Sequence, residues 1–151
     1  MKWNAIVLFG GLWLALPGYS ANVKQERDIS YAEPTCCKLN VKWPTDSTNF
    51  PTVVWFHGGG LTGGERHFIP IDDSIAQVAV SYRLLGQRGL TNGVECIRDA
   101  AAAVAWTLEH IAAYGGDPKK VYVSGMSAGG YLTMMVGMAP QYLKERGHDI
   151  A

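Results

Sequence analysis

The stretch Val121-Tyr122-Val123-Ser124-Gly125-Met126-Ser127-Ala128-Gly129-Gly130 decides the fold of this chain. A β-type run leads into a Gly-x-Ser-x-Gly pattern, and residues 128–138 after it have helical composition. A strand that turns at once into a helix holds the central serine in a strained backbone conformation and lifts its hydroxyl above the sheet edge. The pattern therefore predicts Ser127 as an exposed nucleophile. The alternative is a glycine-rich turn whose serine hydroxyl is simply hydrogen-bonded.

A second motif, His57-Gly58-Gly59-Gly60, lies earlier in the chain. It ends an apolar run, residues 52–56, that is typical of a strand buried on both faces of a parallel sheet. Glycines here let backbone N–H groups point into open space beside the nucleophile. Such donors stabilise the oxyanion of a tetrahedral intermediate by about 3 kcal/mol each. A flexible surface loop would explain the glycines but not their place at a strand end.

The rest of the chain alternates strand-like and helix-like segments. Residues 38–43 indicate an edge strand ended by Pro44, and residues 75–82 indicate another strand. Apolar residues then recur at helical spacing from residue 94 to residue 111, after a helix start at Asn92 resembling a capping box with Glu95. Gly115 and Gly116 end that helix, and Asp117-Pro118 predicts a return turn. The fold class is therefore α/β, with a mainly parallel sheet and flanking helices.

These motifs together resemble those of α/β-hydrolase esterases and lipases. HGGG is followed by GMSAGG, with Ser-Tyr-Arg-Leu at residues 81–84 and Tyr-Gly-Gly-Asp-Pro at residues 114–118 between them. The branch that is most similar includes hormone-sensitive-lipase-like and acetyl-xylan or feruloyl esterases, and the resemblance covers residues 36–139. It implies an α/β-hydrolase fold with Ser127 as nucleophile, and the N–H groups of Gly59, Gly60 and Ala128 as the oxyanion hole. It implies that His57 orients the loop and is not the base.

Composition limits the other possibilities. The 151 residues include 13 basic and 13 acidic side chains, so the net charge of zero gives no reason to expect nucleic acid or an anionic membrane as partner. The mechanism needs no metal or organic cofactor, and no metal-ligand spacing is present. The length allows at most one domain.

Residues 1–20 have the pattern of a secretory signal peptide. Lys2 precedes an apolar stretch that Pro17 and Gly18 end, and small residues follow. A membrane anchor is the alternative, but about 12 strongly apolar residues are too few to span a bilayer. We expect an exported protein, secreted or periplasmic, with no membrane span after cleavage and residues 21–151 as the N-terminal portion of a single α/β-hydrolase domain.

The three cysteines and one pair of charged residues each allow two arrangements. Because the number of cysteines is odd, at least one thiol stays free or pairs outside this segment. A bridge from Cys36 or Cys37 to Cys96 is possible, whereas a bridge between the two neighbours would be strained. Arg83 and Asp99 could form an ion pair beneath the sheet edge; alternatively, both are solvated surface charges.

The general base and its acidic partner are not evident in the sequence. In α/β-hydrolases the acid and then the histidine follow the nucleophilic serine along the chain. The only histidine after Ser127 is His148, and the acids there are Glu145 and Asp149. They lie in a polar segment of helical composition, residues 141–150, and we do not expect His148 to be the base. The chain is therefore expected to be truncated after the helix that follows Ser127, with the triad Asp and His on a missing C-terminal segment.

The function predicted on this basis is carboxylic-ester hydrolysis through an acyl-enzyme on Ser127. The substrate would be a small-molecule or polysaccharide-linked ester. One alternative is a serine peptidase or amidase of the same fold, although such peptidases usually carry a propeller or cap domain before the hydrolase part. The other is a non-catalytic binding protein, which would follow if the chain truly ends at Ala151. A fluorophosphonate probe discriminates, since it labels only an activated serine.

Overall fold

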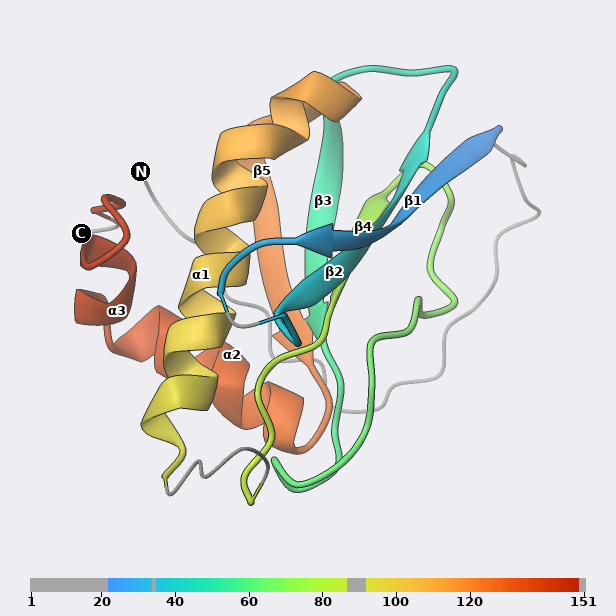
Figure 1. The fold of residues 1–151 in the computed structure, drawn as a ribbon. Coiled ribbons are helices and arrows are strands. Elements are labelled where there is room, and N and C mark those ends of the chain that lie inside the picture. The colour runs from blue at the N-terminus through green and yellow to red at the C-terminus, as the bar shows by residue number, and fades with distance from the viewer. Residues whose placement is uncertain (1–21, 34, 87–91, 150–151) are drawn as a thin grey trace.

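The computed structural model describes residues 22–33, 35–86 and 92–149. The predicted signal peptide lies outside these ranges. A five-stranded sheet has the order β1-β2-β4-β3-β5 (Figure 1). Its strands are β1 (Val23–Ser30), β2 (Lys38–Pro44), β3 (Phe50–Phe56), β4 (Ala76–Val80) and β5 (Gly116–Gly125).

The directions of the strands confirm the predicted α/β class. Strand β3 pairs in parallel with both β4 and β5, whereas β2 is antiparallel to both of its neighbours, β1 and β4. Four strands therefore run in one direction and β2 alone opposes them. The helices are α1 (Val94–His110), the 3₁₀ helix η1 (Ile111–Tyr114), α2 (Ala128–Met138) and the short α3 (Gln141–Lys144).

The core lies between the sheet and the helices α1 and α2, which cover one face of it (Figure 1). Phe50, Val54 and Phe56 alternate along β3 and are buried in this core. Val53 and Trp55 point to the opposite face and are only half-buried, so the prediction of a strand buried on both faces was wrong in part. On that face the backbone N–H of Ile69 donates to Oε1 of Gln77 on β4 (2.9 Å), and the ring of His67 lies edge-on to Trp55 of β3, so this segment covers the face only in part.

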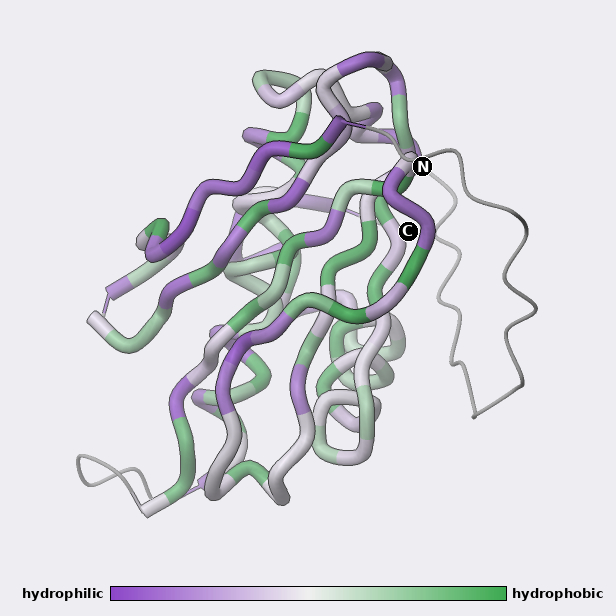
Figure 2. The backbone as a smooth tube through the Cα atoms, turned by 90° about the vertical axis from the view of Figure 1, so that its right-hand side faces the viewer, coloured by the Kyte–Doolittle hydropathy of each residue, from purple (hydrophilic) through white to green (hydrophobic). Residues whose placement is uncertain are grey.

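Strand β1 was not predicted. Five consecutive polar residues, 24–28, fill most of it, and nearly all of its side chains are exposed (Figure 2). It is held by its backbone ladder to β2, which pairs Val23 with Pro44 and Ser30 with Lys38. Because β1 covers that side, β2 is an interior strand, and its prediction as an edge strand was wrong.

The boundaries of α1 and β5 differ slightly from expectation. A cap at Asn92 would make Gly93 the first residue of α1, but the helix begins one residue later, at Val94, and Gly93 is the cap. Oδ1 of Asn92 still accepts the N–H of Val94 (2.9 Å). Gly115 ends η1 with φ 95°, as the glycine pattern indicated. Asp117-Pro118 lies within β5 and not in a separate turn, but the register jumps there from Phe50–Gly116 to Thr52–Val121. The residues between bulge from the ladder, where an edge strand tolerates proline.

At the C-terminal side, the predicted helical segment at residues 141–150 is shorter in the structure, where α3 ends at Lys144. Within the described ranges, no helix has the length and apolar character needed to cross a bilayer.

Candidate active site

Ser127 occupies a strained turn between a strand and a helix. It follows the last residue of β5 by two positions, precedes α2 directly, and has φ 53° and ψ −114°. A residue with a side chain rarely adopts such angles, at a cost of about 1–3 kcal/mol. Backbone bonds hold the turn: Met126 donates to the carbonyl of Phe56 (3.2 Å), and Gly129 donates to the carbonyl of Met126 (2.8 Å). This is the backbone conformation that the Gly-x-Ser-x-Gly pattern predicts.

The glycines on either side of Ser127 allow α2 to approach the sheet closely. A Cβ atom on Gly129 would overlap the backbone carbonyl of Phe56 at the end of β3, and one on Gly125 would overlap the backbone of Gly129. Gly130 has no such neighbour, since its nearest contact would be 3.5 Å away. Two of the three glycines in this stretch are therefore required by direct steric contact.

The HGGG loop (residues 57–60) lies beside this turn. A Cβ atom on Gly58 would be 3.5 Å from Cβ of Ser127 and 3.1 Å from the carbonyl oxygen of Met126. Gly59 and Gly60 have φ 109° and 63°, values that favour glycine. Among the described residues, no acceptor binds the N–H groups of Gly59, Gly60 or Ala128. Three backbone donors predicted to form an oxyanion hole thus have no acceptor among the residues that the structure describes.

His57, the first residue of the HGGG loop, is buried, with 2% of its surface exposed. Burial lowers its pKa, so the imidazole is neutral at pH 7. Its Nδ1 lies 2.6 Å from the carbonyl oxygen of Gly58, to which Nδ1–H donates. Nε2 is buried and has no hydrogen-bond partner among the described residues. His57 makes no hydrogen bond with Ser127, so its contacts suit orientation of the loop and not proton transfer from the serine.

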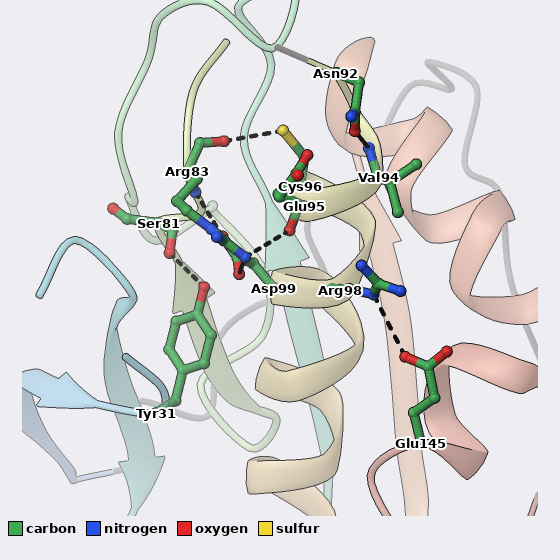
Figure 3. A network of polar contacts seen from close by, with 10 residues as sticks. All are labelled: Tyr31, Ser81, Arg83, Asn92, Val94, Glu95, Cys96, Arg98, Asp99 and Glu145. Atoms are coloured by element: carbon green, nitrogen blue, oxygen red, sulfur yellow. Dashed lines mark hydrogen bonds and ion pairs between the residues drawn. The ribbon is translucent and has the colours of Figure 1, made fainter. Parts of the chain in front are cut away.

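Two residues that follow β4 closely, Tyr82 and Arg83, connect this loop to α1. The Tyr82 hydroxyl, whose pKa burial raises to about 12, donates to the backbone carbonyl of His57 (2.7 Å). The next residue, Arg83, binds Asp99 on α1 through Nε and Nη2, at 2.8 and 2.7 Å (Figure 3). The predicted Arg83–Asp99 pair is confirmed. The sequence did not predict the contact of Tyr82 with His57, although Tyr82 belongs to the Ser-Tyr-Arg-Leu motif.

The other candidate residues that the sequence offered make no hydrogen bond with Ser127. His148 binds Glu109, near the end of α1, at 2.9 Å. In the part of the chain that the structure describes, no side chain hydrogen-bonds to the Ser127 hydroxyl, and no three His, Cys, Asp or Glu side chains could together hold a metal ion. The three cysteines are free thiols, so neither of the two possible bridges to Cys96 forms in the structure.

Comparison with known proteins assigns the family. The BD-FAE family model matches residues 39–146, which include both the HGGG loop and the Ser127 turn. The chain belongs to the BD-FAE family. This BD-FAE domain has the fold of the α/β-hydrolase esterases: Est2, a thermophilic esterase from Thermogutta terrifontis solved with butyrate bound, is 30% identical with a TM-score of 0.59. That match covers 79% of this chain and 44% of the esterase.

Two curated relatives are similar over most of the BD-FAE chain. Liver carboxylesterase B-1 from Rattus norvegicus is 33% identical, covering 79% of this chain and 24% of its own length. Carboxylesterase NlhH from Mycobacterium tuberculosis is 34% identical, covering 74% of this chain and 37% of its own length. The chain therefore spans between about a quarter and somewhat over a third of these relatives.

Proposed function

We propose that this protein is a serine hydrolase that cleaves carboxylic esters through an acyl-enzyme on Ser127. The observation that carries the proposal is the strained conformation of Ser127 (φ 53°) directly beside Gly58 of the HGGG loop. The relatives called carboxylesterases support the ester as substrate. In the reaction, Oγ of Ser127 attacks the ester carbonyl, loses its proton to a base and displaces the alcohol, and water then hydrolyses the acyl-enzyme.

The negative charge that develops on the carbonyl oxygen needs donors already in place. We assign these to the N–H groups of Gly59, Gly60 and Ala128, because none of them is bonded within the described residues. Donors that are fixed before the reaction cost no reorganisation when the charge appears, and each contributes about 3 kcal/mol to the transition state. His57 holds the loop through its contact with the carbonyl of Gly58.

The base is proposed to come from outside the described residues. The side chain of His57 is buried in the protein interior and bound to the carbonyl of Gly58. His148 is bound to Glu109, which lies at the C-terminal end of α1. Chain order in α/β-hydrolases places an acid and then the catalytic histidine after the serine. We therefore place both on a segment that follows Ala151. Strong turnover by residues 1–151 alone, abolished by Ser127→Ala, would overturn this part of the proposal.

We propose esters with short acyl chains as the substrate class. Butyrate bound to the Est2 relative favours esters with short acyl chains, either of small molecules or attached to polysaccharide. The signal-peptide pattern of residues 1–20 favours export to a secreted or periplasmic location.

Labelling tests the nucleophile directly. The product of the complete reading frame, including any codons after Ala151, is treated with a fluorophosphonate probe and the modified peptide is identified by mass spectrometry. Wild type and Ser124→Ala should be labelled on Ser127, and Ser127→Ala should not react. Ser124 is the matched control, since it lies three residues earlier, on the strand β5 that leads into the Ser127 turn. No labelling of the wild type would favour a binding protein.

A second assay separates ester from amide hydrolysis. The same protein is given p-nitrophenyl butyrate and a p-nitroanilide of the same acyl group. A much larger kcat/KM on the ester is expected, whereas comparable values on both would favour the amidase or peptidase alternative.

A further inference from the structure

We propose that Tyr82 is a positioning residue for the HGGG loop, holding the N–H groups of Gly59 and Gly60 toward the Ser127 turn. The effect of Tyr82 on catalysis rests on the proposed function, while its effect on the loop does not. Tyr82 is 3% exposed, lies two residues after the end of β4, and is 25 residues from the histidine that it contacts.

Three successive carbonyl groups in this loop are each held by a hydrogen bond. The carbonyl of His57 accepts from the Tyr82 hydroxyl (2.7 Å), and that of Gly58 accepts from Nδ1–H of His57 (2.6 Å). The carbonyl of Gly59 accepts from the N–H groups of Thr62 and Gly63, both at 3.0 Å. In a trans peptide the N–H of the next residue points opposite to the carbonyl. Fixing the carbonyls of Gly58 and Gly59 therefore fixes the directions of the N–H groups of Gly59 and Gly60.

Tyr82 controls two of these three anchors. Its hydroxyl holds the first carbonyl, and its ring stacks on the imidazole that holds the second, with 4.4 Å between ring centroids and 12° between planes. The backbone of Gly64 is packed against the same imidazole, since a Cβ atom there would be 2.5 Å from Nδ1. The imidazole consequently has little freedom to turn away from Gly58 while Tyr82 is in place.

The residue after Tyr82 is anchored to α1, because Arg83 binds the buried Asp99 through its backbone N–H and its guanidinium (Figure 3). Tyr82 thus lies between this ion pair and the loop beside Ser127.

The test compares Tyr82→Phe with Tyr31→Phe in the ¹⁵N-labelled 151-residue chain. Both variants remove one buried hydroxyl that donates to a backbone carbonyl at 2.7 Å, but only Tyr82 reaches the HGGG loop. Tyr82→Phe should shift the amide resonances of Gly58, Gly59 and Gly60 and speed hydrogen exchange of the Gly63 N–H at least about tenfold. Tyr31→Phe should leave them unchanged. Unchanged glycine resonances in Tyr82→Phe, or equal changes in both variants, would overturn the proposal.

A second variant covers the possibility that Tyr82→Phe does not fold. His57→Phe keeps a ring to stack on Tyr82 but removes the Nδ1 donor to Gly58, so it should disturb the same glycine resonances. If it leaves them unchanged, the carbonyl anchors do not set the loop.

The catalytic arm uses the product of the complete reading frame with p-nitrophenyl butyrate. Tyr82→Phe should lower kcat about tenfold with KM within about twofold, because a displaced oxyanion donor affects the transition state more than substrate binding. Tyr31→Phe should keep kcat within about twofold of wild type. Equal losses in both variants would mean that Tyr82 has only a structural role. If wild type fails to label on Ser127, the proposed function fails, while the resonance comparison still decides the role of Tyr82.

Discussion

The carboxylate of Asp99 binds the Arg83 guanidinium through both of its oxygens, although only 1% of the Asp99 side chain is exposed. Oδ2 of Asp99 also accepts the backbone N–H of Arg83 (2.9 Å). This hydrogen bonding raises the pKa of the guanidinium above its ordinary value. A buried carboxylate with so many donors is stable only while its partner is present.

Removing one member of this pair is predicted to destabilise the fold strongly. Asp99→Asn or Arg83→Met should each lower the free energy of unfolding by about 3–5 kcal/mol, because the remaining charge or donors stay buried without a partner. The double variant should lose clearly less than the sum of the two. Urea unfolding of the four proteins measures the coupling.

An exposed pair supplies the control for that cycle. Arg98 and Glu145 approach to 3.4 Å with about half of each side chain exposed, and their coupling should be below about 0.5 kcal/mol. If the Arg83–Asp99 coupling is no larger, the two residues behave as solvated surface charges despite their burial.

Two adjacent glycines in α2 are predicted to respond oppositely to alanine. Gly129→Ala should destabilise the fold by several kcal/mol or prevent folding, since the new Cβ would overlap the carbonyl of Phe56. Gly130→Ala should be neutral or stabilise by up to about 1 kcal/mol, because it adds helix propensity and its Cβ meets nothing closer than 3.5 Å. Thermal unfolding of the two variants is the measurement. Equal stability of the two would mean that α2 does not approach β3 this closely.

The parts of the molecule that could be predicted are those where local sequence restricts the backbone. The glycines around Ser127 and in the HGGG loop identified both turns, because few other residues fit there. Helical spacing of apolar residues located α1 to within two residues. These patterns involve residues close together in the sequence, so they predict local structure without knowledge of the tertiary contacts.

The parts that were missed depend on distant pairing. Strand β1 has almost no buried side chain, and only its ladder to β2 makes it a strand. The contact of Tyr82 with His57 joins the ends of two strands that are neighbours in the sheet but 25 residues apart in the chain. Spacing within the sequence carries no signal for either contact.

Stability is predicted to fall in mildly acidic solution because of His57. Burial lowers its pKa in the folded state below the ordinary value of 6.5, with His67 lowering it further and the bond to Gly58 and nearby Glu65 opposing the shift. Above pH 6.5 the imidazole is neutral in both states and the full stability is present. As the pH falls through 6.5, the unfolded chain takes up a proton that the folded chain does not, so the free energy of unfolding falls.

Urea unfolding between pH 7.5 and 5 measures this effect in wild type and in two variants. His57→Gln should show a shallower loss of stability with falling pH than wild type, whereas His110→Gln, which changes an exposed histidine, should keep the wild-type slope. The same slope in His57→Gln and wild type would assign the pH dependence to other groups.

The three free thiols are predicted to differ sharply in reactivity. Cys37 and Cys96 are fully buried, and burial raises the pKa of Cys37 to about 12 and also raises that of Cys96. Cys36 is only half-buried. Because the thiolate is the reactive form and must be reached by the reagent, N-ethylmaleimide should modify Cys36 alone in the folded chain.

Mass spectrometry of the purified chain, kept free of reductant, tests this prediction. One adduct is expected in native buffer, three in guanidinium chloride, and none in native Cys36→Ser. A chain that gains only one adduct in guanidinium, yet three after reduction, would contain a disulfide bridge in place of two of these thiols. That result would require the buried side chains around Asp99, where Cys37 and Cys96 both lie, to pack differently from the arrangement described above.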